Sequence, residues 1–237
     1  LKGMDEIFAR TELLTGEEGL EKLKRAKVAV FGIGGVGGYV AEALASSGVG
    51  HLVLIDHDIV TRSNLNRQII ALCSTLGKYK TQVMKERIAD ICPDTCVETQ
   101  ECFFLPENAD TFDFKAYSYV VDAIDTVSGK LALAEHCKKY GTRLISAMGA
   151  GNKWNPANFE VADISQTKIC PLARVMRREL KKRGIEHLKV VYSTEEAVKP
   201  LKEVRSESGK VTPGSLVFSV GTAGLLLASE VVKDLLH

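Results

Sequence analysis

The stretch VAVFGIGGVGGYVAEALASSG, residues 28–48, constrains the fold of this chain more than any other. A short apolar run leads into a cluster of glycines, and a run of small residues with helical character follows. Glycines at such a junction let the backbone turn tightly and approach a phosphate, whose charge then faces the N-terminus of the next helix. The stretch therefore predicts a strand, a phosphate-binding turn and a helix, and it leaves open whether the ligand is a dinucleotide.

Apolar runs alternate with helical periods over the first two-thirds of the chain. Strands are expected at 27–31, 51–56, 96–102, 117–123 and 142–148, with helices at about 36–47, 78–91 and 127–140. Because the strands are apolar nearly throughout, we expect a parallel sheet covered on both faces. The predicted fold class is α/β, a doubly wound, mainly parallel Rossmann-like sheet that binds ligands at the carboxyl ends of its strands.

The pattern is less regular after Gly151. Residues 155–165 are consistent with a strand on the far side of the sheet, 170–184 with a basic amphipathic helix, and 215–229 with a buried closing helix. The polar residues 193–214 have no clear periodicity and are expected to be mobile. A length of 237 residues suits a single domain over 1–237. Residues 164–214 would form its basic crossover segment.

The net charge of +1 indicates no partner by itself, but the charges are unevenly distributed. Residues 168–210 hold 12 Lys and Arg against 6 Asp and Glu, which favours either a solvated face or a contact with nucleic acid. Six cysteines without a C-x-x-C pair argue against a zinc ribbon or a disulfide framework and suit the cytoplasm. We expect neither a signal peptide nor a membrane span.

Polar and charged residues follow the glycine turn at positions that suit a nucleotide. Asp56 ends the next strand, where an acid accepts ribose hydroxyls, or alternatively only caps the strand. The expected nucleotide-binding residues are Gly32, Gly34, Gly35, Gly37, Asp56, Asp58, Asn64, Asn66 and Gln68. Arg67 and Lys80 add two cations, which suit a polyphosphate better than a dinucleotide, although Arg67 could instead form a structural ion pair.

Two carboxylates, Asp122 and Asp125, stand at the end of the fourth strand in VVDAIDT. Magnesium prefers one or two carboxylates together with phosphate oxygens and water. A carboxylate at this strand end is therefore a reasonable ligand for Mg²⁺ beside a triphosphate. Asp122 either coordinates the same ion or orients the loop.

The order of the motifs resembles that of the adenylating enzymes of the ubiquitin-activating superfamily. G-x-G-G-x-G comes first and is followed by D-x-D-x-V-x-x-S-N-L-N-R-Q, a lysine and D-x-x-D. Within this superfamily, three stretches resemble the tRNA threonylcarbamoyladenosine dehydratases. They are FARTELLTGEEGLEKL, SAMGAGNKWNPANFEVADISQTKICPLARVMRREL and LKVVYSTE. Together these resemblances cover nearly the whole chain. They imply that the glycine turn binds ATP.

The resemblance also implies roles for individual residues. Asp56 would bind the ribose, Arg67 and Lys80 the phosphates, and Asp125 the magnesium, while Asn64 and Gln68 would shape the pocket. Arg10 matches an arginine that the family delivers to ATP from a partner subunit, which implies a homodimer; alternatively it is a solvated residue near the terminus. The implied catalytic residues are therefore Arg67, Lys80, Asp125 and Arg10.

The implied reaction is an ATP-dependent cyclisation of threonylcarbamoyladenosine, the modified nucleoside that lies next to the anticodon in tRNA. The threonine carboxylate would form an acyl-adenylate with loss of pyrophosphate, and ring closure would then release AMP. The basic segment would contact the tRNA, and a sulfur-relay protein is a possible further partner.

Other functions stay open at this point. The main alternative is adenylation of the C-terminal carboxylate of a ubiquitin-like sulfur carrier, which uses the same ATP site. An NAD(P) oxidoreductase and a silent binding module fit the cationic residues less well. Cys170 lies where some relatives form a thioester; it is either a reactive thiol or, as we expect, a half-buried one.

Overall fold

A computed structural model describes residues 6–205, 209 and 211–237. Seven strands form one sheet in the order β3-β2-β1-β4-β5-β7-β6. They are β1 (Lys27–Phe31), β2 (His51–Ile55), β3 (Cys96–Gln100), β4 (Tyr119–Asp122), β5 (Leu144–Ala147), β6 (Phe159–Asp163) and β7 (Lys189–Ser193). Every neighbouring pair is parallel except β6 and β7, which are antiparallel.

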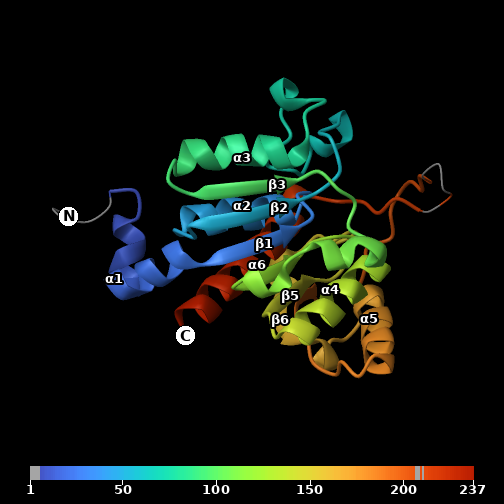
Figure 1. Cartoon of the computed structure of the whole chain (residues 1–237). Coiled ribbons are helices and arrows are strands. Elements are labelled where there is room, and N and C mark those ends of the chain that lie inside the picture. The colour runs from blue at the N-terminus through green and yellow to red at the C-terminus, as the bar shows by residue number, and fades with distance from the viewer. Residues whose placement is uncertain (1–5, 206–208, 210) are drawn as a thin grey trace.

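Helices cover both faces of the sheet (Figure 1). They are α1 (Ala9–Arg25), α2 (Gly37–Ser46), α3 (Lys80–Ile91), α4 (Val127–Tyr140), α5 (Pro171–Lys182) and α6 (Val217–Leu236). Side chains of α2, α3 and α6 share one apolar core with one face of the central strands, whereas α4 packs on the opposite face and α5 packs beside it. The predicted doubly wound α/β fold is confirmed.

The strand order reverses between β1 and β4, and this reversal positions the site. β1 leads outwards to β2 and β3 on one side, while β4 leads to β5 on the other. Backbone hydrogen bonds join the three strand ends: Gly32 N donates to Ile55 O at 2.8 Å, and Ala123 N donates to Phe31 O at 2.8 Å. In a doubly wound sheet a crevice opens at such a reversal, outside the carboxyl ends of the strands.

Two elements are absent from the sequence expectations. β7 was not expected because its apolar residues Val190, Val191 and Tyr192 are too few to establish a period. Helix α1 was not expected from its pattern; it is kinked at Gly16, whose φ of 69° interrupts the helical period. The strand expected within 155–165 is β6, at the edge of the sheet.

Residues 194–216 connect β7 to α6 and contain neither a helix nor a named strand among their described residues. Figure 1 shows this orange-red connection extending beyond the carboxyl ends of β1 and β2. Four residues of the segment that was expected to be mobile, 206–208 and 210, lie outside the described residues. Across the described parts of the chain, no helix has both the length and the apolar character that a bilayer span requires.

Candidate functional site

A cavity of about 360 Å³ lies at the strand reversal. Its walls come from the turn after β1, the residues that follow β2, the start of α3, the residues beyond β3 and β4, and the start of α6. Ten expected site residues line it: Gly32, Gly34, Gly35, Asp56, Asp58, Asn64, Arg67, Gln68, Lys80 and Asp125. Residues spread over about 90 positions of the sequence are thus brought together at one place.

The glycines of the turn have different structural roles. Gly32 has a φ of +90°, and a Cβ there would lie 2.7 Å from the Ala123 carbonyl oxygen. A Cβ on Gly37 would lie only 1.7 Å from the Gly32 carbonyl oxygen, so this glycine closes the turn and does not line the cavity. Gly34 and Gly35 border the cavity itself and allow a ligand to approach the backbone.

Asp56 holds the turn against the end of β2. Its Oδ2 accepts a hydrogen bond from Ile33 N at 2.6 Å, and its Oδ1 accepts one from Asp58 N at 2.8 Å. A carboxylate has about four acceptor positions, so two backbone donors leave capacity for ligand hydroxyls. Asp56 therefore orders the glycine turn and can also accept hydrogen bonds from a ribose.

One end of the cavity is cationic. The buried Lys80 Nζ lies 2.6 Å from Asp58 Oδ2, so Lys80 would have to exchange this partner to reach a phosphate. The Arg67 guanidinium donates to Ser63 O at 2.7 Å and to Asn66 Oδ1 at 2.9 Å. Among the described residues, no carboxylate pairs with Arg67. The alternative in which Arg67 forms a structural ion pair is therefore not seen in this part of the chain.

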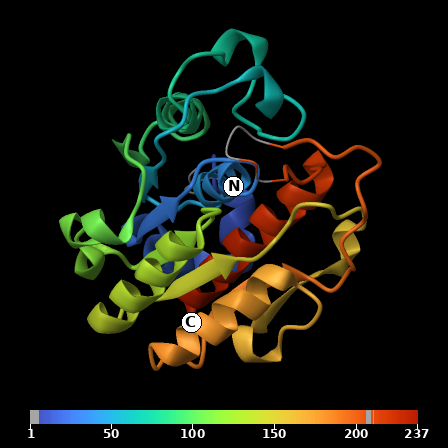
Figure 2. The same ribbon diagram turned by 90° about the vertical axis from the view of Figure 1, so that its right-hand side faces the viewer.

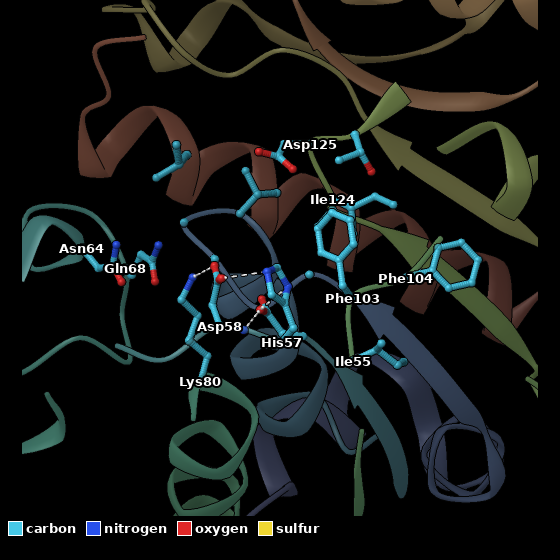
Figure 3. A pocket seen from close by; sticks show the side chains of 18 of the residues that line it. Ile55, His57, Asp58, Asn64, Gln68, Lys80, Phe103, Phe104, Ile124 and Asp125 are labelled. Carbon is cyan, nitrogen blue, oxygen red and sulfur yellow. Dashed lines mark hydrogen bonds and ion pairs between the residues drawn. The ribbon is translucent and has the colours of Figure 1, made fainter. Parts of the chain in front are cut away.

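Two amide side chains complete this end of the cavity (Figure 3). Asn64 Oδ1 accepts a hydrogen bond from Thr61 N at 3.0 Å and so closes the short turn Arg62–Asn64. Gln68 is buried, and its Oε1 has no hydrogen-bond partner within the described structure. A buried polar atom without a partner is costly, and a ligand with a donor group can remove that cost.

The other end of the cavity is apolar. Figure 3 shows Ile55, Phe103, Phe104 and Ile124 on the side opposite to Asn64 and Gln68. The His57 ring meets Phe103 edge-on with ring centroids 4.5 Å apart. These residues suit the flat, apolar faces of a purine base. Sequence reasoning did not identify them, although the run CFFL directly after the third strand would have indicated an apolar wall.

Cys102 also borders the apolar end. Burial, together with the charge of the neighbouring Glu101, raises the pKa of the Cys102 thiol. This thiol is therefore protonated at neutral pH and contributes to the cavity as a small apolar group.

The two carboxylates after β4 differ in environment. Asp122 is 1% exposed and bound by the Lys130 ammonium, with both Oδ atoms 3.1 Å from Nζ, and by the Ser146 hydroxyl. It also accepts a hydrogen bond from Ile124 N at 3.2 Å, so it orients the loop instead of facing a metal. Asp125 is exposed at the cavity wall. An open carboxylate is a ligand that Mg²⁺ accepts together with phosphate oxygens and water.

Two further expected residues, Asn66 and Arg10, lie elsewhere. Asn66 is outside the cavity wall and links Arg67 to the connection between β7 and α6, because its Oδ1 accepts from Arg67 and its Nδ2 donates to Ser215 O at 3.0 Å. Arg10 lies in the first turn of α1 and is exposed. Helix α1 packs on the far end of α6, where a Cβ on Gly19 would touch Leu236, so Arg10 does not reach the cavity of its own chain.

Cys170 is more deeply buried than expected. Its side chain is 4% exposed and packs in the core formed by α4, α5 and β7. A nucleophilic thiol needs a partly exposed, electropositive setting. The structure therefore places Cys170 in a packing role at the start of α5.

Known proteins resemble this chain over almost its whole length. The sequence model of the ThiF family matches residues 8–237. The tRNA threonylcarbamoyladenosine dehydratase of Bacillus subtilis is 44% identical, with 97% of this chain and 94% of that protein covered. Its Escherichia coli counterpart is 40% identical over 81% of this chain and 75% of that protein.

The fold also resembles that of a solved structure over nearly the whole chain. The E. coli tRNA N6-threonylcarbamoyladenosine dehydratase in complex with ATP superimposes with a TM-score of 0.88 and 36% identity, covering 97% of this chain and 93% of that one. The adenylating-enzyme resemblance expected from the motifs is thereby confirmed. Because the family model and close relatives match nearly the whole chain, and the residues of the shared motifs gather in one cavity, the chain belongs to the ThiF family.

Proposed function

We propose that this protein uses ATP to cyclise threonylcarbamoyladenosine in tRNA, as a single adenylating domain over residues 1–237. The observation that carries the proposal is the cavity, whose apolar end suits adenine and whose opposite end gathers Arg67, Lys80 and Gln68. The relatives that cover nearly the full length of this chain are named for the same dehydration of tRNA.

The residues of this chain would act mainly by position and charge. Asp56 holds the ribose, and the glycine turn directs backbone N–H groups at the phosphates. The threonine carboxylate of the substrate attacks the α-phosphorus, and the bond to pyrophosphate breaks. Arg67 and Lys80 stabilise the negative charge that grows on the phosphate oxygens during this step.

The second step would close the ring within the substrate. The carbamoyl group attacks the activated carboxyl carbon, loses a proton and expels AMP, so that the nucleoside loses one water in total. Both reacting groups belong to one nucleoside, so proximity supplies much of the rate acceleration. The protein then needs no covalent carrier, which agrees with the buried position of Cys170.

Mg²⁺ is the metal that this site suits. Asp125 would hold it at the cavity wall, with phosphate oxygens and water as its other ligands. When bound, the ion would neutralise phosphate charge. Asp122 would not take part, because Lys130 and Ser146 already occupy its oxygens.

The tRNA would approach over the basic crossover segment. Helix α5 buries Ala173, Met176 and Leu180 on one face, and its other face exposes the cations Arg174, Arg178, Lys181 and Lys182. Contacts of these cations with phosphates would make binding depend on salt. The pairing of Glu179 with its neighbours, which lowers the pKa of Glu179 to about 2, neutralises part of this surface.

We further propose a homodimer in which Arg10 of one subunit reaches the phosphates in the other, working in the cytoplasm with its tRNA substrate. Support comes from the exposed position of Arg10 at the far end of its own chain. A sulfur-relay protein would be an additional partner.

In the deciding experiment, the protein is incubated with Mg²⁺, ATP and tRNA that carries threonylcarbamoyladenosine. The RNA is then digested, and the mass of the modified nucleoside is measured by mass spectrometry. A mass lower by one water, with AMP formed, supports the cyclase. An unchanged nucleoside, together with pyrophosphate exchange that requires a ubiquitin-like protein, would establish the sulfur-carrier alternative instead.

A further inference from the structure

A second cavity, of about 310 Å³, lies beside the start of α6. It is formed by the turn at 152–154, the part of the crossover segment at 198–202 and residues 214–216. Figure 2 shows this orange-red connection running beside the yellow residues that follow β5. The nucleotide cavity does not include any of these residues.

The wall of this cavity carries the only tryptophan of the chain, Trp154. Its side chain is 61% exposed, but its backbone is firmly held. The Glu195 carboxylate accepts hydrogen bonds from Trp154 N at 3.1 Å and from Asn155 N at 2.9 Å, and the buried Lys153 ammonium donates to the Glu195 carbonyl. An exposed indole on a fixed backbone presents a flat apolar surface to which another flat ring can bind.

Asn152 joins the other two parts of the cavity wall to this turn. Its carbonyl accepts from Val198 N at 2.9 Å, its N–H donates to Gly214 O at 2.8 Å, and its Oδ1 accepts from Gly214 N. Asn152 adopts a φ of +58°, a conformation that asparagine tolerates better than most residues. Both ends of the segment 198–214 are therefore attached to the turn that carries Trp154.

Cations border the apolar surface. Lys199 and Lys202 line the cavity with Val198 and Leu201, and both lysines are exposed. Neither has a carboxylate partner within the described part of the chain. An exposed aromatic ring flanked by unpaired cations is complementary to single-stranded RNA, which presents flat bases between phosphates.

The second cavity is connected to the nucleotide site. Ser215 borders it, and the Ser215 carbonyl accepts a hydrogen bond from Asn66 Nδ2 at 3.0 Å. Asn66 in turn accepts a hydrogen bond from Arg67, which lines the nucleotide cavity. A base held at Trp154 would therefore lie next to the elements that position the reacting phosphates.

We propose that Trp154 stacks on an unpaired base of the tRNA anticodon loop, with Lys199 and Lys202 on the adjoining phosphates. The inference rests on the proposed function and adds the site at which the substrate loop is held. Trp154 is a positioning residue in this scheme, because it holds the loop and does not touch the reacting atoms.

A direct test uses the fluorescence of the single tryptophan. The wild-type protein is titrated with a synthetic anticodon stem–loop and with an RNA duplex that has no unpaired bases, and binding is followed in parallel by the anisotropy of labelled RNA. We expect the stem–loop to quench the emission and the duplex to leave it nearly unchanged. Stem–loop binding without quenching, or equal quenching by both RNAs, would overturn the proposal.

Three variants and one matched control separate base stacking from a general effect of charge. Trp154→Ala should weaken stem–loop binding by about tenfold or more, whereas Trp154→Phe should retain most of the affinity because a ring remains. Lys199→Ala should reduce the salt dependence of binding by about one phosphate contact, while the matched control Lys85→Ala on α3 should not. Equal affinities of the alanine and phenylalanine variants would contradict the stacking role.

The two proposals fail in distinguishable ways. If the wild-type protein forms no cyclised nucleoside, but the stem–loop quenches its emission and that of Arg67→Ala equally, the RNA site is retained and the proposed reaction is rejected. Cyclised nucleoside formed at the wild-type rate and KM by Trp154→Ala would retain the reaction and reject the stacking site. A peptide that quenches the emission while the stem–loop does not would assign the cavity to a protein partner and overturn the inference.

Discussion

Individual glycines of the turn after β1 serve either the fold or the ligand. Gly37 has no room for a side chain, since its Cβ would lie 1.7 Å from a carbonyl oxygen. Gly34 has room, because the nearest atom to its Cβ would be Gln68 Nε2 at 3.8 Å, and it borders the cavity.

This difference predicts opposite phenotypes for two similar substitutions. Gly37→Ala should lower the free energy of unfolding by more than about 3 kcal/mol, because backbone must move to admit the methyl group. Gly34→Ala should fold with nearly unchanged stability but bind ATP about tenfold more weakly, because the methyl group blocks approach to the backbone. Urea denaturation and calorimetric ATP titration measure the two effects. Equal stability of both variants would refute this division of roles.

Arg67 and Asn66 give a second pair of predictions at this scale. Arg67→Ala should slow pyrophosphate release by about a hundredfold or more, because a charge-stabilising donor is lost. Asn66→Ala should have a smaller effect, mainly on the KM for ATP, since Asn66 only holds the guanidinium and Ser215. Steady-state measurement of pyrophosphate separates the two. An Arg67→Ala enzyme with an undiminished rate would remove Arg67 from the catalytic residues.

Most polar members of the cavity could be predicted from sequence, because their side-chain chemistry and their distance from strand ends are both visible there. The expectation for Asn66 was wrong, because its side chain donates to Ser215 outside the cavity, whereas the neighbouring Arg67 lines the cavity. The sequence could not show that Trp154 is exposed or that Gln68 Oε1 has no hydrogen-bond partner. Both properties depend on packing between segments that are distant in the sequence.

At the scale of elements, a buried ion pair fixes the loop between β4 and α4. Asp122 ends β4, Lys130 lies in the second turn of α4, and each side chain is 1% exposed. Lys130 Nζ also donates a hydrogen bond to the Ala147 carbonyl oxygen, at the end of β5, at 2.7 Å. Three elements, β4, α4 and β5, thus meet at one buried ammonium group.

Breaking this pair should be costly. Lys130→Met would leave the Asp122 carboxylate buried without its cation, and we expect a loss of about 3–5 kcal/mol in the free energy of unfolding. The double variant Lys130→Met with Asp122→Asn should recover a large part of that loss, since no buried charge is left. Urea denaturation of both variants checks this. A double variant no more stable than the single one would show that shape, and not charge, is decisive.

A different ionic cluster attaches α6 to the sheet. Asp234 lies 2.8 Å from Lys189 Nζ and accepts a hydrogen bond from Tyr119 Oη at 2.7 Å. Burial alone would raise the pKa of Asp234, but its hydrogen bonds with Lys189 and Tyr119 outweigh burial and lower that pKa. A depressed carboxyl pKa contributes stability that is complete above the unfolded-state pKa and is lost as the pH falls through the folded-state value.

Asp234→Asn should therefore destabilise the protein at pH 7 by about 1–2 kcal/mol. The difference from wild type should shrink below about pH 4, where the unfolded wild-type carboxyl begins to take up a proton. Urea midpoints measured at a series of pH values test both statements. A difference that stays constant down to the acid limit would mean that the carboxylate charge is not responsible.

Elements with a strong period were predictable, and those without one were not. The central strands and α4 agree with expectation because buried parallel strands are short apolar runs between glycines and helices. The antiparallel direction of β6 could not be predicted, since strand direction depends on the connection through α5 and not on residue type.

At the scale of the whole molecule, Arg10 and the nucleotide cavity lie at opposite ends of α6, a helix of 20 residues and so about 30 Å long. If a partner subunit supplies Arg10, then Arg10→Ala and Arg67→Ala should each be nearly inactive alone. Mixing and exchanging the two should restore about a quarter of the wild-type rate, because half of the dimers then have one intact site. Cyclisation assays on the mixture measure this, and no recovery in subunits shown to exchange would exclude a shared site.

The attachment of Val198 and Gly214 to one residue, Asn152, has an evolutionary consequence. Because the ends of this segment are already held together, doubling its length would cost only about 0.6 kcal/mol of chain-closure entropy. The stretch between these two points can therefore be lengthened, shortened or exchanged as a cassette while the adenylating core is preserved. Natural selection could in this way alter which RNAs the enzyme accepts without rebuilding its chemistry.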